Sequence, residues 1–232
     1  MLKNWEKLPD YMKNSMVEQY YKILARKKSV ICVKRIVDFI IALFLTILLS
    51  PVMLVVAIVI RSESKGTIFF RQERITRYGK TFRIFKFRTM VEKADKMGPL
   101  VTKKDDDRIT KSGKILRKIR LDELPQLFNI LAGDMSFVGT RPEVKKYVEA
   151  YSEEMYATLL LPAGVTSMTS ILYKDEEEEI EEYTKEKGIS VDEAYVDYIL
   201  HKKMKHNLEY IETFSVIQDF KIMIKTIFAV LK

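Results

Sequence analysis

The pattern of hydrophobic positions is dominated by one apolar stretch, residues 36–60, in which Asp38 is the single charged residue. Its 25 residues exceed the roughly 20 that an α-helix needs to cross the hydrocarbon core of a bilayer. A core helix of a soluble protein is seldom apolar on every side over such a length. The pattern therefore predicts a helix that enters a membrane.

Two features distinguish this stretch from a simple transmembrane span. Ser50-Pro51 lies past its middle, where proline removes a backbone N–H and bends a helix. Positive charge, which marks the cytoplasmic side of a membrane helix, flanks both ends. The flanking cations are Lys27, Lys28, Lys34 and Arg35 before the stretch, and Arg61 and Lys65 after it. We favour a re-entrant helix-break-helix hairpin that enters and leaves by one face. A kinked full span and a buried core helix are the competing interpretations.

The next segment predicts a β-hairpin. Residues 67–75 and 81–90 alternate apolar and polar side chains on either side of Tyr78-Gly79, a typical hairpin signal. The apolar residues of the second strand keep no single period of two, so we expect a bulge near Phe85 or a turn into the next element there. Lys86 and Arg88 share one face of this strand, which suits either an anionic ligand or the phosphates of lipids.

Residues 116–142 predict a short helix with a defined start. Proline is tolerated only in the first turn of a helix, because it lacks an N–H and its ring clashes with the preceding turn. Pro125 therefore indicates a start, with Asp122 as the N-cap. Gly133 is a natural residue to follow the last turn.

The start of this predicted helix is a candidate site. Asp122 and Glu123 directly follow three cations, Arg117, Lys118 and Arg120. These cations and the positive end of the helix dipole are expected to hold the pKa of Asp122 low, so that it is ionised at neutral pH. They would also hold a phosphate nearby, where a carboxylate is a candidate nucleophile or metal ligand. The alternative is that Asp122 only caps the helix and Glu123 is a solvated acid.

The remaining segments carry weaker signals. Residues 1–29 predict an amphipathic helix that lies on a membrane surface or packs on a partner, with no signal-peptide pattern. Residues 92–111 predict a loop, in which the acids at 105–107 either balance charge or bind a divalent cation. Residues 159–173 predict a loop leading to a short strand, and residues 175–182 predict a solvated acidic helix face. The C-terminal segment predicts an amphipathic helix whose lysines suit a membrane interface.

Charge and cysteine content narrow the possible partners. The net charge is +8 and the sequence pI is about 9.3, which favours an anionic partner such as nucleic acid, lipid head groups or a phosphorylated ligand. Residues 61–120 carry most of the excess, with 19 Lys or Arg against 7 Asp or Glu. Cys32 is the only cysteine, so no intramolecular disulfide can form, and a Cys/His zinc site is not expected. A reducing, cytoplasmic setting fits.

Several stretches, taken in order, resemble the bacterial sugar transferase family of small monotopic phosphoglycosyl transferases. The resemblance covers roughly residues 34–232 and is carried by residues 34–51, 66–75, 78–90, 106–143 and 215–227. It implies an enzyme that moves a phosphosugar from a UDP-sugar to undecaprenyl phosphate and releases UMP, with Mg²⁺ required. It also implies a re-entrant membrane helix broken at Ser50-Pro51.

The same resemblance assigns roles to individual residues. Asp122 corresponds to a nucleophile that forms a covalent phosphosugar intermediate, and Glu123 either helps to bind Mg²⁺ or assists its neighbour. Lys86, Arg117 and Arg141 match positions associated with phosphate binding, and Arg88 on the predicted hairpin joins them as a candidate.

The chain departs from the family pattern in three places. A Gly-Pro-Arg-Pro turn is here Gly139-Thr140-Arg141-Pro142, and the nucleotide-associated segment reads Pro162-Ala163-Gly164-Val165-Thr166-Ser167. A late aspartate is replaced by Asn207, with Glu209 nearby. Contacts to the donor base and any metal role of that aspartate are therefore open.

We accordingly expect an α-rich α/β monotopic membrane enzyme with a small β-hairpin and surface amphipathic helices, on the cytoplasmic face of the bacterial inner membrane. Its expected parts are an N-terminal extension (1–33), a re-entrant helix (34–61) and a catalytic domain (62–232). The expected partners are a UDP-sugar, undecaprenyl phosphate and membrane lipid, without nucleic acid, and a homodimer remains open. The competing hypothesis is a non-catalytic membrane-anchored module that binds anionic lipid or nucleic acid through its basic face.

Overall fold

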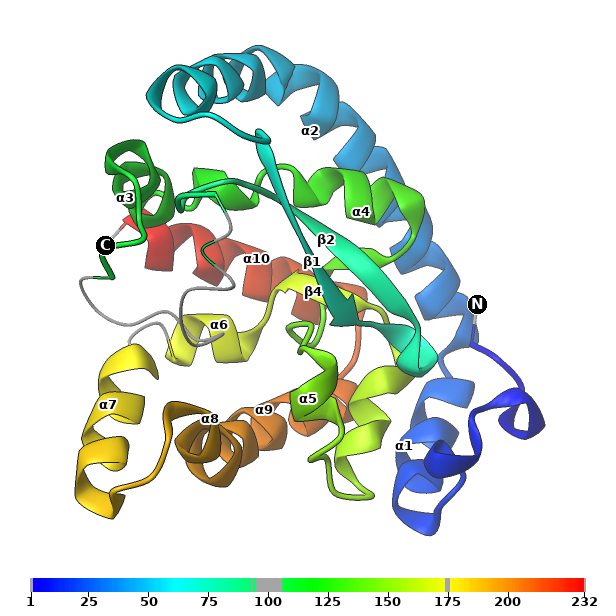
Figure 1. Cartoon of the computed structure of the whole chain (residues 1–232). Coiled ribbons are helices and arrows are strands. Elements are labelled where there is room, and N and C mark those ends of the chain that lie inside the picture. The colour runs from blue at the N-terminus through cyan, green and yellow to red at the C-terminus, as the bar shows by residue number, and fades with distance from the viewer. Residues whose placement is uncertain (1, 93, 95–105, 174–175, 232) are drawn as a thin grey trace.

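Helices surround two small sheets in the structure, a computed structural model that describes residues 2–92, 94, 106–173 and 176–231 (Figure 1). The helices are α1 (Ser15–Ala25), α2 (Lys28–Glu63), α3 (Lys111–Lys118), α4 (Gln126–Ala132), α5 (Lys145–Val148), α6 (Met168–Leu172), α7 (Glu176–Lys187), α8 (Val191–Ala194), α9 (His201–Glu212) and α10 (Val216–Leu231). The strands are β1 (Phe69–Ile75), β2 (Thr81–Phe87), β3 (Met135–Val138) and β4 (Ala163–Thr166). The predicted α-rich class with a small hairpin is confirmed.

The long apolar stretch forms α2, a helix of 36 residues that continues through Pro51. Proline leaves the carbonyl four residues earlier, that of Ile47, without its helical donor. The hydroxyl of Ser50 donates to this carbonyl at 2.8 Å. The expected break at Ser50-Pro51 is therefore not present, because a side chain replaces the missing backbone hydrogen bond and the helix curves instead (Figure 1).

The outer face of α2 is apolar and exposed over most of its length. Its exposed side chains include Ile36, Phe39, Ile40, Leu43, Phe44, Ile47, Leu48, Leu54, Val55, Ile58 and Val59. Among the described residues, α2 is the helix with the length and composition to cross a membrane. Its inner face packs at two places, through Ala42 against β2 and α4, and through Val56 and Ile60 against Phe87 and Leu116. The parts before and after the proline thus rest on the same body.

A buried polar cluster ties the beginning of α2 to α10. Lys34 Nζ lies 2.6 Å from Asp219 Oδ2 and 3.6 Å from Asp38 Oδ2. The hydroxyl of Ser136 donates to Asp38 at 2.6 Å, and that of Tyr210 donates to Asp219 at 2.7 Å. We call these five residues the Asp219 cluster. Asp38, the single charged residue of the apolar stretch, is buried and paired with Lys34.

The predicted hairpin is formed by β1 and β2, which pair in unbroken antiparallel register from Phe69 opposite Phe87 to Ile75 opposite Thr81. Of the two alternatives expected near Phe85, the bulge is absent, and the strand ends two residues later at Phe87. Phe85 is instead accommodated by tertiary contacts, since the guanidinium of Arg71 lies 3.4 Å from the centre of its ring. Irregular apolar spacing in this strand therefore reflects packing on both faces.

The second sheet pairs β3 with β4 in parallel, from Met135 opposite Ala163 to Val138 opposite Thr166. The strand β4 falls in the segment where a short strand was expected, but β3 was not predicted. The backbones approach closely after β3, because a Cβ atom on Gly164 would lie 2.2 Å from the amide nitrogen of Gly139. Figure 1 shows α10 running behind this sheet.

The N-terminal segment packs on the rest of the chain. The buried side chains of Leu8, Met12 and Leu24 belong to the main core cluster, together with residues of α9. The backbone N–H of Lys3 donates to the hydroxyl of Tyr78 at the hairpin tip, at 2.9 Å. The apolar face that was expected to meet a membrane or a partner is thus largely covered within the molecule.

The acidic helix predicted near residue 175 and the C-terminal amphipathic helix are both confirmed, as α7 and α10. The outer face of α10 exposes an apolar row comprising Ile217, Phe220, Ile224, Ile227 and Phe228. Ile222 on its inner face is buried in the main core.

Candidate active site

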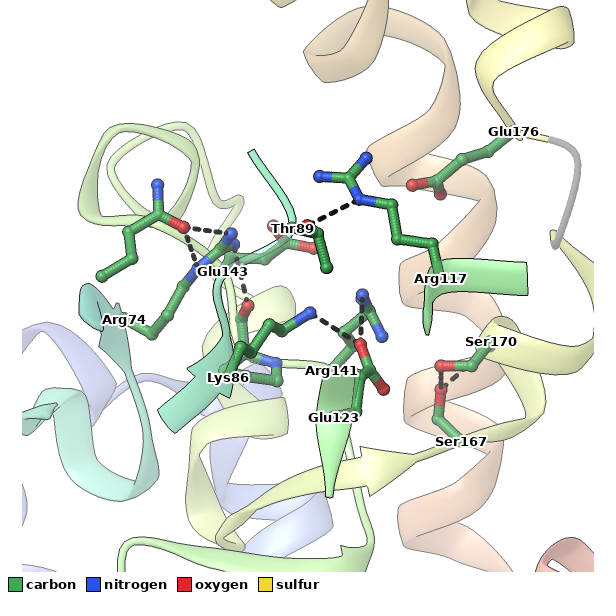
Figure 2. A network of polar contacts seen from close by, with 12 residues as sticks. Arg74, Lys86, Thr89, Arg117, Glu123, Arg141, Glu143, Ser167, Ser170 and Glu176 are labelled. Carbon is green, nitrogen blue, oxygen red and sulfur yellow. Dashed lines mark hydrogen bonds and ion pairs between the residues drawn. The ribbon is translucent and has the colours of Figure 1, made fainter. Parts of the chain in front are cut away.

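A carboxylate between two cations marks the candidate site (Figure 2). Lys86 Nζ lies 2.6 Å from Glu123 Oε1, and Arg141 Nη2 lies 3.5 Å from the same oxygen. These residues come from β2, from the turn before α4 and from the segment after β3, and we call them the Glu123 cluster. The structure thus brings together three of the predicted site residues that are far apart in the sequence.

The turn that carries Asp122 and Glu123 differs from the predicted helix start. Arg120 adopts a left-handed conformation with φ of 56°, and residues Leu121–Glu123 form a separate 3₁₀ turn. The helix α4 begins only at Gln126, with Pro125 before it. Asp122 is therefore not an N-cap, because the chain reverses at Arg120 and Asp122 turns into the interior. Gly133 ends the helix with φ of 86°, as predicted.

Asp122 is buried, and its Oδ1 has no hydrogen-bond partner among the described residues. Burial raises the pKa of Asp122, and Lys86 only partly opposes this effect. The predicted lowering of this pKa is therefore wrong, since withdrawal from water outweighs the nearby cations. A buried polar atom without a partner is costly, and such atoms concentrate where a protein uses them for binding or chemistry.

Glu123 has the opposite character. Burial alone would raise the pKa of Glu123, but Lys86 and Arg141 outweigh it and lower the pKa to about 2. The side chain is therefore a permanent anion that fixes two cations. Adjacent carboxylates with pKa values pushed apart are typical of sites in which the two residues have different roles.

Arg117 and Arg88 occupy different surroundings. Arg117 Nε donates to the hydroxyl of Thr89 at 2.9 Å (Figure 2). Arg88 is buried, and its guanidinium donates to the carbonyls of Lys65 and Ser64 at 2.9 Å. Arg88 thus holds the loop after α2, and the structure does not bring it to the Glu123 cluster. The Nε atom of Arg88 has no hydrogen-bond partner among the described residues.

The charges of Glu143 and Glu176 act on Arg141. The polar contacts that hold these two residues were not predicted from the sequence. Two residues beyond Arg141, Glu143 accepts a hydrogen bond of 2.6 Å from the hydroxyl of Tyr195. Lys203 Nζ lies 3.1 Å from the Tyr195 oxygen and 2.7 Å from Glu176 Oε2. The only signal in the sequence was the acidic run that contains Glu176, which is typical of a solvated helix.

The segment that departs from the family pattern also borders the site. Ser167 caps α6, and its Oγ lies 2.9 Å from Ser170 Oγ. Figure 2 shows both side chains together with the Glu123 cluster. Asn207 is buried on α9, where its side-chain Nδ2 donates to Met204 Sδ at 3.7 Å. It shows no link to the Glu123 cluster.

The donor set for a metal ion is small. The described residues contain no group of three or more His, Cys, Asp or Glu side chains placed to hold a metal. Of the acids predicted at 105–107, Asp105 lies outside the described residues, and Asp106 is paired with Arg108 at 2.6 Å. Asp122 Oδ1 is the oxygen at the site that fits a cation, since Glu123 is already held by two basic side chains.

A family model matches the part of the chain that carries these residues. The family model described as bacterial sugar transferase matches residues 29–232. The chain belongs to this family. The matched region contains the whole Glu123 cluster, Asp122 and the long apolar helix, whereas most of the N-terminal segment that packs on the core lies outside it.

Curated relatives align over most of this family member. It is 34% identical to a UDP-N-acetylgalactosamine-undecaprenyl-phosphate N-acetylgalactosaminephosphotransferase of Aeromonas hydrophila over 203 residues, 86% of this chain and 44% of the relative. It is 34% identical to a UDP-glucose:undecaprenyl-phosphate glucose-1-phosphate transferase of Caulobacter vibrioides over 84% of this chain and 68% of the relative. An exopolysaccharide production protein of Sinorhizobium fredii is 34% identical over 85% of this chain and 84% of its own length. The chain spans less than half of the Aeromonas relative.

Proposed function

We propose that this protein is a phosphoglycosyl transferase that moves a sugar 1-phosphate from a UDP-sugar to undecaprenyl phosphate and releases UMP. The observation that carries the proposal is Asp122, a buried carboxylate with an oxygen that lacks a partner among the described residues, beside a cluster that holds two cations. Family membership supports it, and the printed names of the relatives refer to UDP-sugars and undecaprenyl phosphate.

The reaction proceeds in two displacements. A carboxylate oxygen of Asp122 attacks the phosphorus that carries the sugar, the bond from this phosphorus to UMP breaks, and UMP leaves with the bonding electrons. A phosphate oxygen of undecaprenyl phosphate then attacks the same phosphorus. The bond to Asp122 breaks, the carboxylate is regenerated, and the lipid carries a diphosphate linked to the sugar. One site can thus serve first a soluble donor and then a lipid acceptor.

The cations of the site provide the electrostatic part of the mechanism. An anion that attacks a diphosphate must overcome charge repulsion, and fixed positive groups lower this barrier in the transition state. Lys86 and Arg141 are held in place by Glu123. Arg117 is oriented by Thr89. Lys86 also favours the ionised form of Asp122, which the attack requires.

Magnesium fits the same arrangement. A bound Mg²⁺ ion adds positive charge at the diphosphate and at the leaving phosphate. Mg²⁺ is commonly held by one or two carboxylates together with substrate phosphates and water. Asp122 would be the protein ligand of the ion. Glu123 would act indirectly, because it holds the side chains of Lys86 and Arg141 in place. Chelation should prevent formation of the sugar-phosphate adduct, and added Mg²⁺ should restore it.

The membrane arrangement is part of the proposal. Both parts of α2 rest on one body and both ends are basic, which supports a helix that dips into the cytoplasmic leaflet and returns. The exposed apolar row of α10 would lie on the same surface. In a Cys32→Ser background, cysteines at Lys3 and Lys65 should be labelled from the same side of sealed vesicles. Labelling from opposite sides would show a true span.

The chemical proposal is tested with Asp122→Asn. We expect the variant to remain in the membrane fraction, to release no UMP from any UDP-sugar of a broad panel, and to form no sugar-phosphate adduct detectable by mass spectrometry. Asp134→Asn is a matched control, because Asp134 pairs with Lys80 at the far end of the hairpin. A non-catalytic lipid-binding module would instead tolerate Asp122→Asn and show only salt-sensitive lipid binding. Full turnover by this variant would refute the assignment of Asp122 as the nucleophile.

A further inference from the structure

We propose that Glu176 recognises the sugar of the nucleotide-sugar donor by accepting hydrogen bonds from its ring hydroxyls. The inference rests on the proposed function, because it assigns a residue to one part of that donor. It identifies a specificity-determining side chain at a position where the sequence indicated only a solvated acidic helix.

The first argument is position. Glu176 is the first residue of α7, and Figure 2 shows its side chain extending from that helix toward the side chain of Arg117. Its charge acts on Arg141, since Glu123 and then Glu176 raise the pKa of that guanidinium. Glu176 therefore belongs to the surroundings of the site, although its side chain remains 27% exposed.

The second argument is orientation. Glu176 Oε2 is held at 2.7 Å by Lys203 Nζ, and the Lys203 side chain is only 5% exposed. Lys203 is itself fixed by the hydroxyl of Tyr195 at 3.1 Å. Glu176 Oε1 makes no hydrogen bond or ion pair with any described residue. One oxygen is thus anchored in the interior, and the other is available to a ligand.

The third argument is the distribution of charge. The other carboxylates near the site have assigned partners or roles, since Glu123 holds Lys86 and Arg141, and Glu143 accepts from Tyr195. A further anion would repel the donor's diphosphate. A carboxylate is, however, a strong acceptor for the hydroxyl groups of a neutral sugar ring. Glu176 is therefore suited to the uncharged end of the donor.

A hydroxyl group lies in the same part of the site. Ser170 Oγ is 2.9 Å from Ser167 Oγ, and a serine hydroxyl can both donate and accept. It can therefore donate to or accept from a sugar hydroxyl or an acyl group. Ser167, which holds Ser170, is the last residue of the segment 162–167 in which the chain departs from the family pattern.

The test compares a ligand that has a sugar with one that lacks it. Full-length protein carrying Asp122→Asn, reconstituted in nanodiscs, is titrated calorimetrically with UDP and with UDP-glucose, UDP-galactose and their N-acetyl counterparts. Adding Glu176→Gln should weaken binding of the preferred UDP-sugar by about tenfold. Binding of UDP should be unchanged or tighter, because a negative charge near the diphosphate has been removed.

Glu179→Gln is the matched control, because Glu179 lies on the same helix and pairs with Lys202 at 3.0 Å. It should leave every affinity unchanged. If Glu176 serves only as the counter-ion of Lys203, Glu176→Gln will change the UDP and UDP-sugar affinities equally, or neither, and either result overturns the inference. Thermal unfolding of each variant separates this outcome from loss of structure.

Failure of the inference is distinguishable from failure of the proposed function. Binding of the sugar is measured without turnover, so a loss of UDP-sugar affinity confined to Glu176→Gln supports the inference. The nucleophile is tested separately, by UMP release and adduct formation with Asp122 intact. An active enzyme with unaltered donor affinities in Glu176→Gln would reject this inference alone.

Discussion

Two ionic clusters of this protein look alike but differ in burial and in hydrogen bonding. Lys34, Asp38 and Asp219 are buried, whereas the side chain of Arg141 in the Glu123 cluster is 33% exposed. In the Asp219 cluster, Lys34 faces two carboxylates, and each carboxylate also accepts from a hydroxyl, Ser136 for Asp38 and Tyr210 for Asp219. In the Glu123 cluster, the neighbouring Asp122 has an oxygen that no described residue satisfies. Satisfied buried networks hold elements together, whereas a buried carboxylate oxygen without a partner beside fixed cations is a candidate for a ligand or a reaction.

The locations fit this difference. The Asp219 cluster joins the beginning of the membrane helix α2 to α10 and to β3. The Glu123 cluster joins β2 to the turn before α4 and the segment after β3 (Figure 2). Charge alone therefore does not identify a site, and completeness of hydrogen bonding separates the two clusters.

The largest expected effect is on chemistry. Asp122→Asn should lower UMP release by at least about 1,000-fold, because removing a nucleophile removes the covalent step. It should also raise the unfolding temperature at neutral pH. Burial raises the pKa of Asp122, so its contribution to stability is present at low pH and is lost as pH rises through the folded-state pKa. Reduced stability together with lost activity would contradict this account.

The second prediction breaks the other cluster. Lys34→Met leaves Asp38 and Asp219 buried without their cation and should cost about 3–5 kcal/mol of unfolding free energy. UMP release per folded molecule should persist, because no residue of this cluster reaches the site. Lys13→Met removes an exposed pair with Asp10 and should change stability by less than about 1 kcal/mol. Equal unfolding temperatures for Lys34→Met and wild type would refute the structural role.

The third prediction concerns acid stability. The pKa of Glu123 falls from 4.5 to about 2 on folding. This shift corresponds to about 3 kcal/mol, present above pH 4.5 and lost as pH falls toward 2. Denaturation of wild type and Glu123→Gln, measured from about pH 6 down to about pH 2.5, should show a steeper loss of stability in acid for wild type. Parallel curves would mean that Glu123 is not held as an anion.

The smallest effect tests a single satisfied group. Ser50→Ala leaves the carbonyl of Ile47 without a donor, because Pro51 has no N–H, and should cost about 1 kcal/mol. Ser62→Ala is the matched control, since Ser62 donates at 2.9 Å to the carbonyl of Val59 and no proline follows it. Thermal unfolding in nanodiscs should shift for Ser50→Ala only. Equal shifts of the unfolding temperature in the two variants would show that the Ser50 hydroxyl does not compensate for the missing N–H of Pro51.

Much of the architecture could be read from the order of residues. The apolar length of residues 36–60, the alternation around Tyr78-Gly79, and the position of Gly133 depend on periodicity and backbone conformation, which are local properties. The helix α2, the hairpin and the end of α4 therefore follow from short segments alone. The candidate residues Lys86, Glu123 and Arg141 were also found in advance, through a resemblance that extends over most of the chain.

Only the tertiary structure determined which charged residues stabilise the fold and which lie at the candidate site. The pKa of Asp122 rises because the chain reverses at Arg120 and buries this carboxylate, and no count of nearby arginines predicts burial. Arg88 holds a loop, and Lys203 fixes Glu176, because segments distant in sequence meet there. Sequence patterns determine which helices and strands form. Desolvation and long-range ion pairing depend on the whole fold, and they determine which charged side chains stabilise the structure and which are available for catalysis.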